Sequence, residues 1–242
     1  MVQQGIAETR EKAKALIMAG IVEVNKIPAE KPGQVFPSTS RITLKKPYPP
    51  YVSRGGLKLE AALDAFSIPI EDRTFLDIGA STGGFTDCLL QRGARKVITV
   101  DVGYGQLHWR LRQDPRVVIL EKKNARYLTQ EDIPVPFHGA VIDVSFISLK
   151  QIIPPVTTVL LPNALIVALI KPQFEVGKGL VGKGGVVRDP LLHEKVVEEI
   201  AGFCKDLGWD IIGCIPSPIL GPKGNKEFLM YMTRQQHPVS SI

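Results

Sequence analysis

The chain has 242 residues, 44% of them hydrophobic, which suits one core domain with a small second domain. Its longest apolar run, residues 164–170, is seven residues long and too short to cross a bilayer, and the N-terminal sequence lacks the apolar segment of a signal peptide. Three widely spaced cysteines and four scattered histidines predict reduced thiols, a cytoplasmic protein and no metal site.

The net charge of +6 is unevenly distributed along the chain. Residues 1–58 contain ten Lys/Arg and four Asp/Glu, whereas residues 59–242 contain twenty of each. An excess of positive charge confined to the first quarter of the chain indicates a polyanionic partner and favours nucleic acid. A solvated basic surface without a partner is the alternative.

The first quarter contains a predicted helix over residues 5–20, which carries Arg10, Lys12 and Lys14 off its apolar stripe. Short strands are predicted at residues 21–24 and 41–44. The stretch TREKAKALIMAGIVEVNKIPAEKPG resembles the small RNA-binding domain that a ribosomal small-subunit protein shares with many pseudouridine synthases. That domain normally begins with one more helix, so the resemblance implies a truncated RNA-binding domain over residues 1–46, followed by a proline-rich linker over residues 47–54.

The next helix is predicted at residues 57–66, where Leu59, Leu63 and Phe66 mark the core face at helical spacing. Lys58 lies off this stripe near the start of the helix, where a cation opposes the helix dipole. That small misfit suggests a functional lysine, although most lysines on a surface need no such explanation.

The stretch TFLDIGASTGGF, residues 74–85, has the pattern of an apolar strand, a glycine-rich turn and the start of a helix over residues 85–91. Glycines let the backbone approach a ligand closely, and a helix start offers free N–H groups. The following strand, residues 96–102, carries Asp101 at its carboxyl end, where an acid can bind ribose hydroxyls. The turn does not match the dinucleotide fingerprint G-x-G-x-x-G. It predicts a nucleotide-cofactor site, with a purely structural tight turn as the alternative.

Beyond this turn, strand and helix patterns alternate. Such alternation predicts an α/β fold with a doubly wound, mostly parallel sheet and an antiparallel last strand. Ligands then bind at the carboxyl ends of the strands, where the strand order reverses. Strands are predicted at residues 117–120, 140–144, 164–170, 210–215 and 227–232, and helices at residues 105–113, 148–160 (interrupted by Pro154 and Pro155) and 190–207.

Charged residues stand at the ends of two predicted buried strands, Asp143 on one and Lys171 on the other. A charge there is costly unless it is paired or used, although it can also simply mark where a strand reaches the surface. In a doubly wound sheet the first, fourth and fifth strands are neighbours, so Gly79, Asp143 and Lys171 should share one edge. An antiparallel last strand would bring Glu227 to the same edge, and Lys58 is within reach.

The order and context of Lys58, Asp143, Lys171 and Glu227 match the Lys-Asp-Lys-Glu tetrad of FtsJ-like ribose 2′-O-methyltransferases, and DIGASTGGF resembles their cofactor turn. The stretches SRGGLKLEAAL, DVSFISL, KPQFE and GKGGVVRD resemble the TlyA/hemolysin A branch of that family. The resemblance implies a class I, Rossmann-like methyltransferase domain over residues 55–236. It also implies S-adenosylmethionine as methyl donor and ribosomal RNA, in ribosomal subunits, as acceptor. In that branch the acceptors are cytidine 2′-hydroxyls of 16S and 23S rRNA, or of 16S alone.

The resemblance further implies roles for individual residues. Lys171 is expected to be the general base and Asp143 to orient it, while Lys58 and Glu227 orient the ribose. A second ammonium nearby favours a neutral Lys171 and nearby carboxylates favour its charged form, so the sequence leaves its protonation open. The expected cofactor contacts are Gly79, Ala80, Ser81, Gly83, Gly84, Phe85, Asp101, Val102, Asn124 and Ala125. The expected RNA contacts are Arg10, Lys12, Lys14, Arg54 and, on a glycine-rich loop at residues 175–189, Lys178, Lys183 and Arg188.

Three other functions are compatible with parts of the sequence. A nicotinamide-dependent reductase would use the glycine-rich turn of residues 79–84 and Asp101, but such an enzyme gives the tetrad no purpose. A hemolysin-like membrane-active protein is suggested by the name of the branch, but no apolar span supports it. An RNA-binding protein with a vestigial methyltransferase site would not need an intact tetrad.

Overall fold

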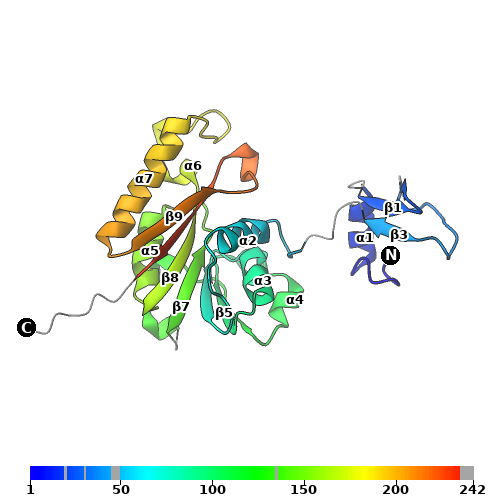
Figure 1. Ribbon diagram of the computed structural model, residues 1–242, viewed down its shortest axis with the longest axis horizontal. Helices are drawn as coiled ribbons and strands as arrows, with labels where there is room; N and C mark the ends of the chain where they lie inside the picture. Colours follow the sequence, from blue (N-terminus) through cyan, green and yellow to red (C-terminus); the bar gives the residue numbers. More distant parts are fainter. Residues whose placement is uncertain (19–20, 30, 45–49, 134–135, 235–242) are drawn as a thin grey trace, which may run out of the picture. The chain divides into compact units, whose positions relative to one another are not determined.

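Figure 1 shows a computed structural model, which describes the chain except residues 19–20, 30, 45–49, 134–135 and 235–242 and the side chain of Lys178. The chain divides into two compact units, Met1–Pro50 and Tyr51–Ile242. The domain and linker boundaries expected from the sequence stay predictions. Residues 47–49 of the expected linker lie outside the described residues, and Tyr51 is buried in the core of the larger unit.

The smaller unit packs one helix on a three-stranded antiparallel sheet with the order β2-β1-β3. Its core joins Ala13 and Leu16 of the helix to Val22 and Val24 of the central strand. The helix begins later than predicted because the Thr9 hydroxyl accepts the Lys12 N–H at 3.1 Å and caps the first turn. The elements are α1 (Arg10–Met18), β1 (Val22–Val24), β2 (Ile27–Pro28), which was not predicted, and β3 (Ile42–Leu44).

The larger unit is built on a seven-stranded sheet with the order β6-β5-β4-β7-β8-β10-β9. Neighbouring strands from β6 to β8 are parallel, and β10 runs antiparallel to both β8 and β9. This order confirms the predicted doubly wound, mostly parallel sheet with an antiparallel last strand. The strands are β4 (Thr74–Ile78), β5 (Lys96–Val100), β6 (Val117–Leu120), β7 (Phe137–Ile142), β8 (Leu160–Ile170), β9 (Asp210–Pro216) and β10 (Phe228–Thr233).

Helices cover both faces of this sheet, with α2 and α3 on one face and α5 and α7 on the other (Figure 1). The alternation of side chains along β4 explains the two layers, because Phe75 packs toward α2 and α3 while Leu76 and Ile78 pack toward α5 and α7. The helices are α2 (Gly55–Ala65), α3 (Gly84–Gln91), α4 (Trp109–Arg112), α5 (Leu149–Thr157), α6 (Pro172–Glu175) and α7 (Pro190–Asp206). Short 3₁₀ helices are η1 (Ala125–Tyr127), η2 (Gln130–Asp132), η3 (Lys178–Leu180) and η4 (Pro222–Gly224).

Some element bounds differ from the predicted ones. The helix predicted at residues 105–113 begins only at Trp109, where the His108 ring accepts the Arg110 N–H and caps it. The prolines Pro154 and Pro155 do not interrupt α5, because its buried apolar side offsets the two missing backbone donors. In the part of the chain that the structure describes, no helix is both long and apolar enough to cross a bilayer.

Candidate active site

The glycine-rich turn after β4 takes the shape that its glycines allow. Gly79 and Gly83 have φ of 84° and 96°, in the left-handed region that favours glycine. A Cβ on Gly79 would lie 2.5 Å from the Asp143 carbonyl oxygen, so only glycine lets β4 and β7 approach here. Ser81, between these two glycines, also has a positive φ of 48°. The turn therefore keeps a glycine-like backbone at Ser81, at a cost of about 1–2 kcal/mol.

Asp101 follows β5 and closes the other side of the turn. Its Oδ2 accepts the Ser81 N–H at 2.8 Å, and its Oδ1 accepts the Gly103 N–H at 2.7 Å. The first of these bonds compensates part of the strain at Ser81. Each carboxylate oxygen retains a second acceptor position, which a ribose hydroxyl can use. The predicted role of Asp101 as a ribose ligand is therefore compatible with its role in shaping the turn.

Two cavities meet at this turn. One, of about 460 Å³, contains Lys58, Asp143 and Lys171, and the other, of about 500 Å³, contains Asp101. The two cavities share the lining residues Gly79, Ser81, Asp143 and Ser145. Of the predicted cofactor residues, Gly79, Ala80, Ser81, Gly84, Phe85, Asp101, Val102, Asn124 and Ala125 line one cavity or both. Gly83 lines neither cavity; it is the N-cap residue of α3 and packs against Leu107 and Leu111.

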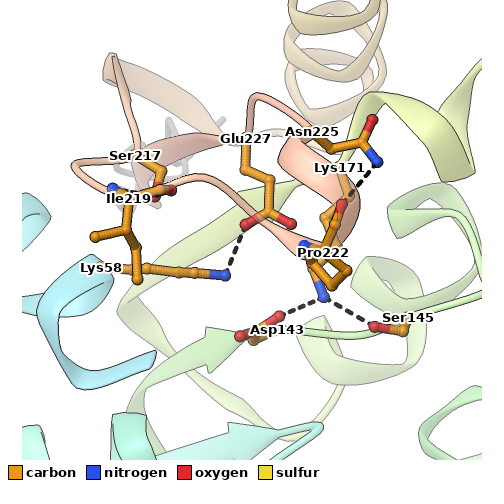
Figure 2. A network of polar contacts seen from close by, with 9 residues as sticks. All are labelled: Lys58, Asp143, Ser145, Lys171, Ser217, Ile219, Pro222, Asn225 and Glu227. Carbon is orange, nitrogen blue, oxygen red and sulfur yellow. Dashed lines mark hydrogen bonds and ion pairs between the residues drawn. The ribbon is translucent and has the colours of Figure 1, made fainter. Parts of the chain in front are cut away.

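The four predicted catalytic side chains form two ion pairs at the same edge of the sheet (Figure 2). Lys171 Nζ lies 2.5 Å from Asp143 Oδ1 and donates a hydrogen bond to Ser145 Oγ at 2.9 Å. Lys58 Nζ donates to Glu227 Oε2 at 2.6 Å. Strand order explains the first pair, because β7 and β8 are neighbours and each residue follows its strand directly. The antiparallel direction of β10 explains the second pair.

Burial makes these pairs energetically significant. Lys58, Lys171 and Glu227 are only 8%, 7% and 1% exposed. The helical pattern suggested a surface position for Lys58, which is instead buried because it turns toward Glu227 (Figure 2). Charges this deep are stable only when paired or hydrogen-bonded. Glu227 Oε1 has no hydrogen-bond partner among the described residues, so this site is not arranged for stability alone.

Asp77, in the middle of β4, is a further polar residue of the site that the sequence argument overlooked. It lines the cavity that holds Lys58 and Lys171, and it is fully buried. Thr86 donates to its Oδ2 at 2.6 Å, whereas Oδ1 has no hydrogen-bond partner among the described residues. Burial raises the pKa of Asp77 to about 7. A charge inside an otherwise apolar strand was the available signal for it.

Phe146 and Ser145 were also not singled out as individual residues. Phe146 is 90% exposed with a φ of 64°, and its ring centroid lies 4.9 Å from that of Phe174. Lys171 Nζ lies 6.0 Å from the Phe174 ring centroid. An exposed aromatic ring therefore stands close to the candidate base. The motif DVSFISL contains both residues, but no local pattern reveals the positive φ or the neighbouring lysine.

The predicted RNA-contacting residues are distributed over both units. In α1, Arg10 and Lys14 are exposed and Lys12 is half-buried. In the larger unit, Arg54 is exposed and lines the cavity that contains Lys58, Asp143 and Lys171. Lys183 and Arg188 are exposed on the glycine-rich loop at residues 175–189. The side chain of Lys178 lies outside the described residues.

A known protein family matches each of the two units. The FtsJ-like methyltransferase family matches residues 51–234, and the S4 domain matches residues 1–39. The chain is 48% identical over 236 residues to the 16S/23S rRNA (cytidine-2′-O)-methyltransferase TlyA of Mycobacterium tuberculosis, covering 97% of this chain and 88% of that protein. It is 42% identical over 229 residues to Hemolysin A of Brachyspira hyodysenteriae, covering 94% and 95%. A solved structure of a Streptococcus thermophilus protein named as a hemolysin superposes with a TM-score of 0.78 at 46% identity, covering 97% of this chain and 86% of that one.

Proposed function

The chain belongs to the FtsJ-like methyltransferase family, and we propose that it transfers a methyl group from S-adenosylmethionine to a cytidine 2′-hydroxyl of 16S or 23S ribosomal RNA. The observation that carries the proposal is the pair of buried ion pairs, Lys171 with Asp143 and Lys58 with Glu227, beside the Gly79 turn. A relative of 48% identity bears the same activity in its name. Because the acceptor is ribosomal RNA, we place the reaction in the cytoplasm.

The two joined cavities fit S-adenosylmethionine in size and chemistry. Their volumes of about 460 and 500 Å³ lie in the usual range for small-molecule sites. Asp101, Val102, Asn124 and Ala125 line the same cavity, where Asp101 would bind the ribose hydroxyls and the other three would flank the adenine. Oδ1 of Asp77 has no hydrogen-bond partner among the described residues and would accept from the amino group of the cofactor. When bound, the cofactor supplies an electrophilic methyl group on a sulfonium.

The remaining chemistry falls to the protein. A ribose hydroxyl is a weak nucleophile until its proton leaves, so a positioned base accelerates the reaction. Lys171 takes that proton, and Asp143 and Ser145, which line both cavities, hold its Nζ. Lys58 and Glu227 orient the ribose: Lys58 lines the cavity, and its ammonium is paired with Glu227. Most of the rate then comes from holding oxygen and methyl carbon in line.

Exposed residues around the cavity suit an RNA acceptor. Phe146 presents an aromatic face on which an unstacked base can lie. Arg54, Lys183 and Arg188 can contact phosphates of the RNA, and so can Arg10, Lys12 and Lys14 of the S4 domain. Lys178 belongs to the same proposal. We leave the choice between the two ribosomal subunits to experiment.

The test is to incubate the purified protein with ribosomal subunits and S-adenosylmethionine and to map ribose methylation by mass spectrometry. We expect Lys171→Ala to abolish methylation while S-adenosylhomocysteine still binds in isothermal titration. The matched control is Lys205→Ala, which removes an exposed lysine at the end of α7. Near-normal turnover by Lys171→Ala contradicts the assignment of the base, and failure of the wild-type protein to methylate any ribosomal RNA contradicts the proposed function.

A further inference from the structure

Two loops of the larger unit contact each other next to Glu227 in the chain. The first is the glycine turn, residues 182–187, where Gly184 and Gly185 both have φ of 80°. The second is the β9–β10 loop, residues 217–226, which connects two strands and leads directly into Glu227. Asn225 belongs to the second loop, contacts the first and is only 3% exposed. No role was predicted for Asn225 from the sequence.

The Asn225 amide uses both of its N–H donors and accepts one hydrogen bond in joining these loops. Its Oδ1 accepts the Val187 N–H at 3.1 Å, and its Nδ2 donates to the Gly185 carbonyl at 3.0 Å. The same Nδ2 donates to the Pro222 carbonyl at 3.1 Å, as Figure 2 shows. Only an amide side chain of this size supplies one acceptor and two donors, and a carboxylate would face two carbonyl oxygens without a proton to offer. The identity of residue 225 is therefore specified by its partners.

The β9–β10 loop in turn touches the Glu227 carboxylate through Gly221. A Cβ on Gly221 would lie 2.1 Å from Glu227 Oε1, which is the oxygen that has no hydrogen-bond partner among the described residues. Gly221 has a φ of −71°, which any residue can adopt, so the close contact with Glu227 is what excludes a side chain there. Asn225 also fixes this contact, because its backbone carbonyl accepts the Gly221 N–H at 2.9 Å.

A second side chain strengthens the same junction. His193 of α7 is 4% exposed, and its Nε2 lies 2.9 Å from the Val187 carbonyl. Its ring packs against Phe228, the first residue of β10, at 5.7 Å between centroids. The N–H of Val187 is thus bound by Asn225 and its carbonyl by His193. Asn225 precedes Glu227 by two residues. The glycine turn, the β9–β10 loop and the start of β10 form one connected unit.

We propose that Asn225 is a positioning residue for methyl transfer: it locks the β9–β10 loop onto the glycine turn, keeps Gly221 against Glu227 Oε1, and so directs Glu227 Oε2 to Lys58. The inference rests on the proposed function, since the benefit of a fixed Glu227 is a fixed ribose. It adds to that function a residue outside the tetrad and a reason for the glycine at position 221.

The experiment compares Asn225→Asp, which keeps the shape and removes both donors, with the control Asn163→Asp. Asn163 is an exposed residue near the start of β8, at the opposite edge of the sheet from the tetrad. Because a misplacement of about 1 Å can cost about 100-fold in rate, we expect kcat for RNA methylation to fall about 100-fold in Asn225→Asp. The KM for RNA and the affinity for S-adenosylhomocysteine should stay unchanged, as should all parameters of the control.

Gly221→Ala provides a second, independent variant if Asn225→Asp fails to fold. Its backbone is unstrained, and its methyl group pushes on Glu227 directly, so it should reproduce the loss of kcat with unchanged KM. The inference is overturned if either folded variant keeps the wild-type kcat. It is also overturned if Asn225→Asp raises the KM for RNA at unchanged kcat, because the loops would then serve RNA binding.

A measurement without turnover separates this inference from the proposed function. A crystal structure of Asn225→Asp should show Gly221 displaced and the contact between Lys58 Nζ and Glu227 Oε2 lost or lengthened. An unchanged contact would overturn the role of Asn225 even if the wild-type protein methylates RNA normally. Conversely, if the wild-type protein methylates no ribosomal RNA, the displacement of Glu227 still decides whether Asn225 positions it.

Discussion

Removing Lys58 while keeping Glu227 should destabilise the protein more than removing both. The Glu227 side chain is 0% exposed and that of Lys58 is 10% exposed, and their charged atoms are 2.6 Å apart. In Lys58→Met the carboxylate stays buried without its cation, which costs about 3–5 kcal/mol. For a unit of this size each kcal/mol lowers the melting temperature by about 2–4 °C, so we expect a decrease of about 6–20 °C.

The double variant Lys58→Met/Glu227→Leu removes the buried charge together with its partner. Replacing a buried ion pair by apolar side chains is often neutral or stabilising by about 1–4 kcal/mol. Here the change also removes Oε1 of Glu227, a buried oxygen for which the described part of the chain provides no hydrogen-bond partner. We therefore expect the double variant to melt at or above the wild-type temperature and to have no methyltransferase activity. Such a result would show that the pair is kept for chemistry and not for stability.

The assay is thermal unfolding followed by circular dichroism, with S-adenosylhomocysteine titration to confirm that the cofactor site is intact. Lys150→Met is the control, because Lys150 and Glu199 form an exposed pair at 3.3 Å that should contribute less than about 1 kcal/mol. The reasoning is refuted if Lys58→Met melts like this control. It is also refuted if the double variant is as unstable as Lys58→Met, since the loss would then come from packing.

Three further predictions concern the cofactor and acceptor sites. Asp77 has a pKa raised to about 7 by burial, so it is largely protonated near pH 6 and ionised near pH 8. S-adenosylhomocysteine carries an ammonium and should therefore bind more tightly as the pH rises through 7. An affinity that does not change with pH would contradict the contact. Asp77→Asn should remove that pH dependence. Asp101→Ala removes two hydrogen bonds that the carboxylate accepts from backbone amides of the turn. Because a charged hydrogen bond contributes about 1.5–3 kcal/mol, cofactor affinity should fall at least about tenfold. An unchanged affinity in calorimetry would exclude Asp101 from the site. Phe146→Ala should weaken RNA binding by about 1–3 kcal/mol, the usual value for stacking on one base, and leave cofactor affinity unchanged. Equal RNA affinities of the variant and the wild-type protein in a filter-binding assay would disprove the stacking role.

The fold was predictable because its signals are local. Apolar runs of strand length alternate with amphipathic helical segments, and a mostly parallel, doubly wound sheet buries such runs on both faces. The predicted neighbours β4, β7 and β8 follow from that topology. The less reliable parts were the element ends, because capping side chains such as His108 decide where a helix begins. The resistance of α5 to its two prolines likewise depends on tertiary packing.

The sequence by itself singled out two polar residues of the candidate site: an acid and an amine at the ends of buried strands are costly, so Asp143 and Lys171 stand out from their apolar surroundings. Tertiary structure alone decided how they are used. Lys58 pairs with Glu227 across 169 positions of the chain, and Asn225 binds Val187 across 38. Hydrogen bonds between distant segments depend on the order of the strands and the path of the loops, and neither leaves a periodic trace in the sequence.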